Sequence, residues 1–306
     1  MIQALLACVE EPEAPPATLA LVLEVHAENG LLQPEAEVAM VEALSAAAGE
    51  LPISFGLGPE YLAQAGAVDA AIAALGRGQG VNMHGDLTAT DAESRTTELA
   101  RRMLDFAPLE GARPDIVSGL CDATPTWVEA SVAAGVTAGL GPVEYCQLSL
   151  DPGGAAGEAY AVAEASGCAA AGFTGCHSPA PTVGPDRQRL FPWRTESTAT
   201  WTVDDGGALA LVGGFEADAV DCLARASTED CGYQSAADAD ADIAALGRSL
   251  RRARGRLNAG EHGTYYLTWS TNRIATTEYI EAWFAGLDAL LGEGFEAEGL
   301  GEVLGR

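Results

Sequence analysis

The stretch that most constrains the fold of this chain is the apolar run LALVLEVHAENG, which begins at Leu19 and ends at Gly30. A continuous Leu and Val run closed by a glycine predicts a strand that is buried on both faces, as in a parallel sheet. At its carboxyl end the run places His26 and Glu28 two positions apart, and therefore on one face. Ligands bind at that end of the strands in parallel α/β folds. The alternative is a pair of surface side chains after a core strand.

Strand and helix patterns alternate about five times before residue 143. The predicted strands are Leu19–His26, Pro52–Gly58, Gly80–Asp86, Pro114–Cys121 and Val136–Val143, and the predicted helices are Glu35–Ala48, Pro59–Leu75, Thr90–Ala107 and Pro125–Ala134. Alternation of this kind predicts an α/β fold with a parallel sheet or barrel.

The middle of the chain breaks this pattern. Residues Glu144–Asp204 are rich in Gly, Pro and Cys, and they predict a long ordered excursion over one face. A late hairpin is expected next, with strands at Trp201–Val203 and Ala208–Val212 around the turn DDGG. The predicted elements after it are a helix at Asp238–Asn258, a strand at Thr264–Trp269 and a final helix at Thr276–Leu291.

Composition excludes several classes of function. The 306 residues carry a net charge of −28, which argues against nucleic-acid backbones and anionic membrane surfaces as partners. All 16 basic residues are arginine, so neither Schiff-base chemistry on a lysine nor a phosphate-binding loop with its lysine is available. No stretch is long and apolar enough to span a membrane.

The cysteines indicate an oxidising compartment. None of the seven forms a C-x-x-C pair, which argues against a structural zinc site. Cys168 and Cys176 bracket one short loop, and Cys222 and Cys231 bracket another, as loop-closing disulfides do. Cys121 and Cys146 follow neighbouring predicted strands, so we expect them to pair across the barrel mouth. Six cysteines allow about 15 pairings, so other links stay open.

The remaining cysteine, Cys8, ends the sequence Leu5-Leu6-Ala7-Cys8, which resembles a bacterial lipobox. An acidic, Pro-rich stretch follows it to Thr18, whereas Met1–Ala4 lacks a basic residue and is short for a signal peptide. Either the true signal begins upstream or the match is chance. The lipobox predicts a lipidated tether over residues 1–18 and one domain over 19–306. It also predicts a periplasmic or outer-surface location, with membrane contact only through the lipid.

A second pair, His84 and Asp86, ends the third predicted strand in the same His-x-acid pattern as His26 and Glu28. Imidazole and carboxylate groups are ligands for divalent metals, and catalytic sites leave one position open for water. The alternative is that one of these histidines is a hydrogen-bonded core residue. His262 precedes its strand, at the opposite end, and is expected on the surface.

Aromatic side chains gather late in the chain. Trp193 and Arg194 lie in the sequence FPWR, and Trp269 lies near the carboxyl end of the last predicted strand. Tryptophan faces stack on sugar rings, and arginine binds carboxylate or carbonyl oxygens. These residues therefore predict contacts with a carbohydrate at the mouth of a pocket. The alternative is that the aromatics pin the long excursion to the barrel.

The layout over residues 19–291 resembles the polysaccharide deacetylase-like superfamily of the NodB-homology type. The stretches that carry the resemblance are VLEVHAENG, ALGRGQGVNMHGDLT and FPWRTESTATW. The resemblance implies a distorted (β/α)7-type barrel, with the Cys-rich excursion between the fifth strand and the late hairpin. It also implies a metal-dependent hydrolase that acts on carbohydrate N-acetyl, or related amide or ester, groups in the cell envelope.

The hydrolase hypothesis assigns a role to each candidate residue. His26, His84 and Asp86 would hold a divalent metal, zinc by ligand type, and Glu28 would take a proton from the bound water. Arg194 would steady Glu28 or the substrate. Trp193 and Trp269 would contact the glycan.

Two departures from the family pattern favour an alternative. Thr88 stands where the family has a second metal histidine, and Glu28 with Asn29 replaces the two aspartates of the first motif. These changes favour a catalytically inactive glycan-binding envelope lipoprotein of the same fold. The two His-x-acid pairs favour the enzyme. The sequence leaves the oligomeric state open.

Overall fold

The computed structural model describes residues 15–27, 34–85, 94–120, 126–141, 190–201, 203–213, 235–271 and 275–305. All seven cysteines lie outside these ranges, as do Glu28, Asp86 and Thr88. The predicted lipidation, the three disulfides and the course of the excursion therefore stay predictions.

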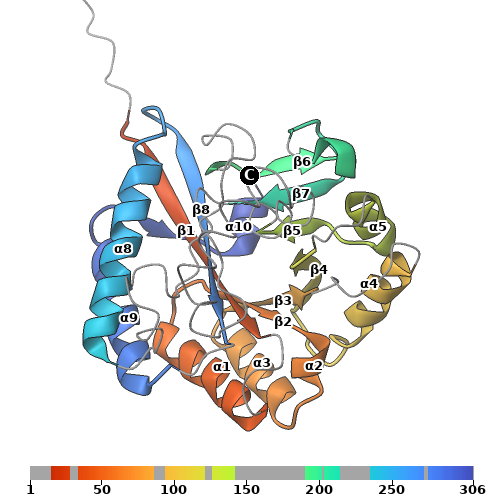
Figure 1. The fold of residues 1–306 in the computed structure, drawn as a ribbon, viewed down its shortest axis with the longest axis horizontal. Coiled ribbons are helices and arrows are strands. Elements are labelled where there is room, and N and C mark those ends of the chain that lie inside the picture. The colour runs from red at the N-terminus through yellow and green to blue at the C-terminus, as the bar shows by residue number, and fades with distance from the viewer. Residues whose placement is uncertain are drawn as a thin grey trace, which may run out of the picture.

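The described strands form one largely parallel sheet that bends into a ring (Figure 1). Its parallel strands are β1 (Thr18–Ala27), β2 (Ser54–Leu57), β3 (Gly80–His84), β4 (Arg113–Ser118), β5 (Ala138–Leu140), β7 (Leu209–Val212) and β8 (His262–Ser270). The hydrogen-bonded order is β6-β7-β5-β4-β3-β2-β1-β8, with β6 (Trp193–Thr195) antiparallel to β7 and β9 (Glu296–Ala297) paired to β1. Within the described residues no ladder joins β8 to β6. The predicted distorted seven-stranded barrel is confirmed.

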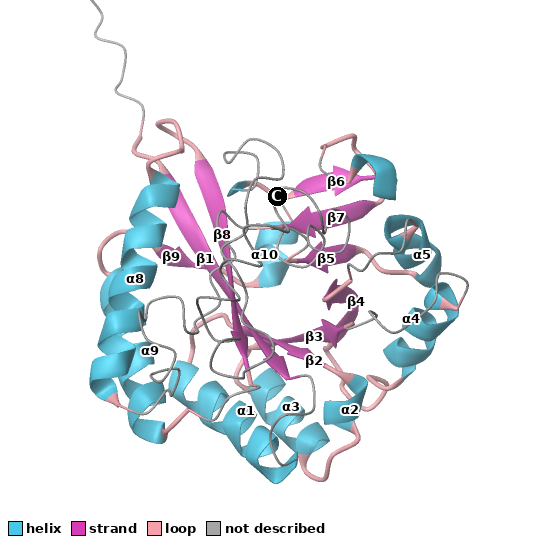
Figure 2. Cartoon of the chain, viewed as in Figure 1, coloured by secondary structure: helices cyan, strands magenta, loops and turns pink. Residues whose placement is uncertain are grey.

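Helices surround the ring of strands, as Figure 2 shows. They are α1 (Pro34–Ala48), α2 (Pro59–Leu62), α3 (Ala67–Gly76), α4 (Arg95–Leu104), α5 (Trp127–Ala134), α8 (Ala236–Arg254) and α9 (Thr277–Leu291), with the 3₁₀ turn η3 (Thr198–Thr200) beside α5. The exception is α10 (Leu300–Leu304), which lies within the ring (Figure 1). In the part of the chain that the structure describes, no helix has the length and apolarity needed to cross a bilayer.

Successive side chains on each strand point to opposite faces of the sheet, so the protein has one hydrophobic core between the strands and the helices and a second one inside the barrel. On β1, residues such as Leu21 and Val25 pack outward against the helices, while Val22 belongs to a smaller interior cluster. Two residues of α10 fill that interior from the amino ends of the strands. The interior cluster consists of Val22, Ile116, Ala138, Leu140, Ala210, Val212, Tyr266, Leu300 and Val303. The half of the barrel at the amino ends of the strands is therefore filled, and α10 closes that end. The sequence analysis did not predict this helix.

Two predicted elements differ from the structure. The helix expected over Pro59–Leu75 is two helices, because Gly66 adopts a φ of 86° between α2 and α3. The hairpin pairs β7 with Trp193–Thr195 instead of Trp201–Val203. The reason lies in the turn: the backbone NH groups of Gly206 and Gly207 bond to Asp204 and Asp205, which brings β7 back against β6.

Candidate active site

A layer of buried polar side chains lies above the apolar interior, near the carboxyl ends of the strands. Its members are Glu24 and His26 on β1, Asn82 and His84 on β3, Ser118 on β4 and Tyr266 on β8. All six are buried, and no more than 3% of any of them is exposed to solvent. A buried polar cluster is costly unless its members satisfy one another, so its contacts show what it is built to hold.

The carboxylate of Glu24 is the centre of this layer. Its Oε1 accepts a hydrogen bond from Asn82 Nδ2 at 2.6 Å, and its Oε2 accepts one from the Tyr266 hydroxyl. The same Oε2 lies 3.1 Å from His26 Nε2. Burial alone raises the pKa of the Glu24 carboxyl, but the charge and hydrogen bond of His26, with the bonds from Tyr266 and Asn82, bring it below its ordinary value. Glu24 is therefore an ionised carboxylate inside the barrel.

The two histidines predicted from the sequence lie side by side. The ring centroids of His26 and His84 are 4.5 Å apart. His26 Nε2 is also 3.3 Å from the Tyr266 hydroxyl, and His84 Nδ1 is 2.9 Å from Ser118 Oγ. Each ring is thus held through one nitrogen by a buried oxygen. The other two members of the predicted constellation, Glu28 and Asp86, lie outside the described residues.

Close packing around Glu24 requires a glycine on β2. A Cβ at Gly56 would lie 2.4 Å from Glu24 Oε1 and 2.9 Å from Ser118 Oγ, distances that no side chain tolerates. We expect Gly56→Ala to destabilise the protein by about 1–3 kcal/mol, because the buried network has to move. Urea unfolding measures this cost.

The matched control for that substitution is Gly76→Ala. Gly76 is the last residue of α3, and a Cβ there has no atom within 4 Å, so the control is expected to be neutral or slightly stabilising. Equal stability of the two variants would contradict the proposed packing.

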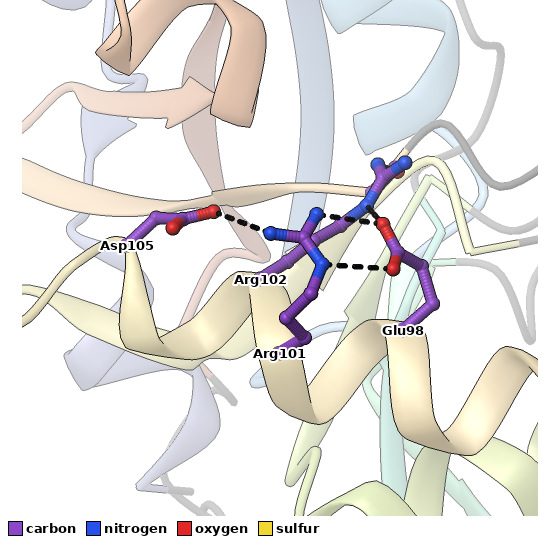
Figure 3. Close-up of polar contacts among 5 residues, drawn as sticks. Glu98, Arg101, Arg102 and Asp105 are labelled. Atoms are coloured by element: carbon purple, nitrogen blue, oxygen red, sulfur yellow. Dashed lines mark hydrogen bonds and ion pairs between the residues drawn. The ribbon is translucent and has the colours of Figure 1, made fainter.

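Helix α4 fixes the ends of two strands that carry the site, and Figure 3 shows the ion pairs of Glu98 with Arg101 and Arg102 on this helix. Arg102 donates to Gly85 O, directly after His84, and Arg95 donates to Leu120 O beyond the end of β4 at 3.1 Å. Glu98 holds Arg102 Nε at 2.7 Å and also binds Arg101 at 2.8 Å. The hydrogen bonds from Arg101 and Arg102 lower the pKa of Glu98 to about 2. Glu98 therefore stays charged at any working pH and keeps Arg102 oriented toward β3.

The remaining predicted residues lie elsewhere. Arg194 donates to Gly207 O and Ala208 O, both at 2.8 Å, which ties β6 to the turn before β7. Trp193 is buried and donates through Nε1 to Trp201 O at 2.7 Å. These contacts fit the alternative interpretation, in which the aromatics pin the segment to the barrel.

Trp269 corrects one expectation. It lies on the outward face of β8 and packs against Trp283 and Tyr279 of α9, with ring centroids 5.0 and 5.9 Å away. Only 1% of it is exposed. Its expected position at the mouth of a pocket is wrong, because residues on this face of β8 meet the helices and those on the other face meet the interior.

The sequence analysis missed the role of Glu24, Tyr266, Asn82 and Ser118. One signal was available: Glu24 interrupts an otherwise apolar run two positions before His26, and an ionisable residue on a strand buried on both faces needs a partner. The partners themselves lie on strands far away in the chain, which no local pattern reveals.

Known protein-family models do not match the chain, and neither do curated protein sequences. Solved structures do match. A Mycobacterium smegmatis protein described as a "putative polysaccharide deacetylase" superposes with a TM-score of 0.53 at 10% identity, over 97% of this chain and 92% of that one. The chain has the deacetylase-type barrel fold.

Two other solved structures share this fold. An allantoinase matches with a TM-score of 0.56 at 8% identity, over 94% of this chain and 89% of that one. A GH57 branching enzyme from Thermococcus kodakaraensis matches with a TM-score of 0.55 at 11% identity, over 94% of this chain and 71% of that one. The deacetylase-type barrel is thus shared by proteins whose names give different substrates, so this chain's chemistry has to be argued from its own residues.

Proposed function

We propose that the polar layer is the active site of a metal-dependent hydrolase that removes N-acetyl, or related amide or ester, groups from a carbohydrate. The observation that carries this proposal is the pair of buried imidazoles of His26 and His84. They are 4.5 Å apart at the carboxyl ends of β1 and β3, and each is anchored at one nitrogen.

The residues fit a zinc-type ion in the chemistry of their donors. A histidine that binds a metal through one ring nitrogen commonly makes a hydrogen bond through the other nitrogen to a carboxylate or hydroxyl group, and this bond fixes the orientation of the ring. Glu24 serves His26 in this way, and Ser118 serves His84. The nitrogens opposite these contacts, Nδ1 of His26 and Nε2 of His84, would hold the ion together with Asp86. A bound zinc ion lowers the pKa of its water and polarises a carbonyl group.

The other side chains orient and balance charge. Glu24 accepts the Nε2–H of His26, which leaves Nδ1 as the ligating nitrogen of a neutral ring, and the Tyr266 hydroxyl and the Asn82 amide keep its carboxylate in place. Glu28, four residues after Glu24, is the proposed base that takes the proton from the attacking water. Arg102 holds the backbone at Gly85, the residue between His84 and Asp86.

A carbohydrate substrate is supported by the fold that this chain shares with proteins named as a polysaccharide deacetylase and a branching enzyme. Removal of an acetyl group is supported by the protein named as a polysaccharide deacetylase. The lipobox-like sequence that ends at Cys8 supports an envelope location, where acetylated glycans occur. The order of preference is therefore an N-acetyl glycan first and another amide or ester second.

The test is a screen on acetylated glucosamine oligomers. Chelator-treated protein is assayed for acetate release before and after zinc is added back. Release that depends on zinc supports the proposal. Oligomer binding without release at any zinc concentration would favour the inactive glycan-binding alternative, and neither binding nor release would contradict both.

A further inference from the structure

A second group of metal-ligating side chains lies at the opposite end of the barrel. His262 begins β8, Glu296 begins β9, and Glu298 follows β9. One ligand atom from each can be chosen so that all three lie within 4.8 Å of one another. Since the polar layer lies near the carboxyl ends of the strands, this group is separate from the proposed active site.

The imidazole of His262 is already oriented within the group. Its Nε2 lies 2.8 Å from Glu298 Oε1, and its Nδ1 lies 2.5 Å from Thr18 Oγ1 and 3.8 Å from Glu296 Oε2. Without an ion, Nε2–H of His262 donates to the Glu298 carboxylate and Nδ1 accepts from the Thr18 hydroxyl. An ion that replaced the Nε2 proton would be held by Nε2, with the ring proton on Nδ1 then donated to Thr18 Oγ1. This is the arrangement in which a hydroxyl group fixes a ligating ring from behind.

The backbone brings these residues together across β1. The pairing register places Thr18 beside His262, and it places Ala20 beside both Thr264 and Glu296. Glu298 N donates to Leu21 O at 3.0 Å, and Thr18 N donates to Glu261 O at 2.9 Å. The small side chain of Ala20 leaves room for groups from β8 and β9 to meet over it. The three donors are therefore held by strand pairing, although 36 residues separate His262 from Glu298.

An independent observation is the hydroxyl of Thr264. This side chain is only 1% exposed, and its Oγ1 has no hydrogen-bond partner among the described residues. Thr264 lies two positions after His262, on the same face of β8 and in the row of Ala20 and Glu296. A buried hydroxyl without a partner is costly, and a water molecule bound to an ion beside it would supply that partner.

We propose that His262, Glu296 and Glu298 bind one divalent ion of the zinc class at the amino end of the barrel. One imidazole with two carboxylates suits such an ion better than calcium, which prefers oxygen ligands alone. The ion offsets the repulsion between two carboxylates in a chain of net charge −28. By joining β8 to β9 beside the start of β1, it also fastens the segment that leads into α10.

Zinc titration of the full chain tests this site, and every variant is also made in a His84→Ala background to remove a ligand of the proposed active site. The His84→Ala protein is expected to bind zinc still, with a rise in its unfolding temperature. Adding His262→Ala, or Glu298→Gln, is expected to weaken that binding by about tenfold or more and to remove the rise. Glu281→Gln on α9 makes the same charge change at an exposed position and is expected to leave binding unchanged.

Two further measurements keep the result decisive. Circular dichroism without zinc shows whether each variant folds, and a crystal of the unaltered protein soaked in zinc locates the ion by anomalous scattering. A peak between His262 and the two glutamates supports the site. A peak only at His84, no zinc binding in the His84→Ala protein, or unchanged binding after His262→Ala would overturn it. A variant that loses hydrolase activity but keeps its zinc binding bears on the proposed function and not on this second site, so the two failures can be told apart.

Discussion

Replacing His84 with alanine is expected to lower zinc affinity at the mouth of the barrel and acetate release by at least about a hundredfold each. The imidazole lies 4.5 Å from that of His26, and Ser118 anchors it from behind. Without it, only one of the two imidazoles in the described layer remains to hold the ion. The ratio kcat/KM on an acetylated glucosamine oligomer, measured at saturating and at limiting zinc, gives the loss.

Whether added zinc or imidazole restores activity to His84→Ala distinguishes a metal ligand from a structural residue. If His84 binds the ion, added zinc or imidazole recovers part of the activity, whereas a loss that comes from lower stability alone is not recovered by zinc or imidazole. A matched control is His262→Ala, which removes an imidazole at the far end of the barrel and is expected to retain kcat/KM when zinc is in excess. A His84→Ala protein with full activity and full zinc content would refute the assignment.

Ser118 provides a graded second test of the same geometry. Its hydroxyl contacts His84 Nδ1 at 2.9 Å and is not among the proposed ligands of the ion. Ser118→Ala is expected to weaken zinc binding and kcat/KM by about 10-fold to 100-fold, with recovery at higher zinc concentration, because the ring loses its orientation but remains. An unchanged zinc affinity would show that the contact is only structural.

The sequence predicts the barrel well because its evidence is local. The run from Leu19 to His26 and the helix that begins at Pro34 are determined by neighbours a few positions away, and both occur as expected. The points at which a predicted helix is interrupted are less predictable. Gly66 divides a predicted helix because its φ is positive, and a glycine within a helical pattern does not reveal its φ in advance.

The candidate site is only half predictable from the sequence, because its members come from strands far apart in the chain. His26 and His84 were identified because each ends a strand, and parallel strands align their carboxyl ends. Tyr266 lies 242 residues from Glu24, yet both reach the same volume because β8 pairs with β1 along its whole length. Trp269 shows the converse: its position near a strand end suggested a pocket, but the alternation of faces sends it to the helices.

Replacing Glu24 with alanine is expected to cost about 3–5 kcal/mol in the free energy of unfolding at pH 7, measured with urea. The substitution removes a buried negative charge that accepts bonds from Asn82 and Tyr266 and lies beside His26, so three buried polar groups lose their partner together. Glu24→Gln keeps the shape and is expected to cost less. Glu281→Ala, at an exposed position on α9, should change stability by no more than about 0.5 kcal/mol.

The cost of Glu24→Ala should also depend on pH in a defined direction. The pKa of Glu24 in the folded protein lies below its ordinary value of 4.5, so the folded state binds this proton less tightly than the unfolded state does. The stabilisation is therefore complete above pH 4.5 and is lost as the pH falls through the lower folded value. The gap between the unaltered protein and Glu24→Ala should therefore narrow as the pH falls below 4.5. A gap that widens in acid would mean that the pKa of Glu24 is raised in the folded protein, contrary to the stabilisation of its ionised form by Asn82, Tyr266 and His26.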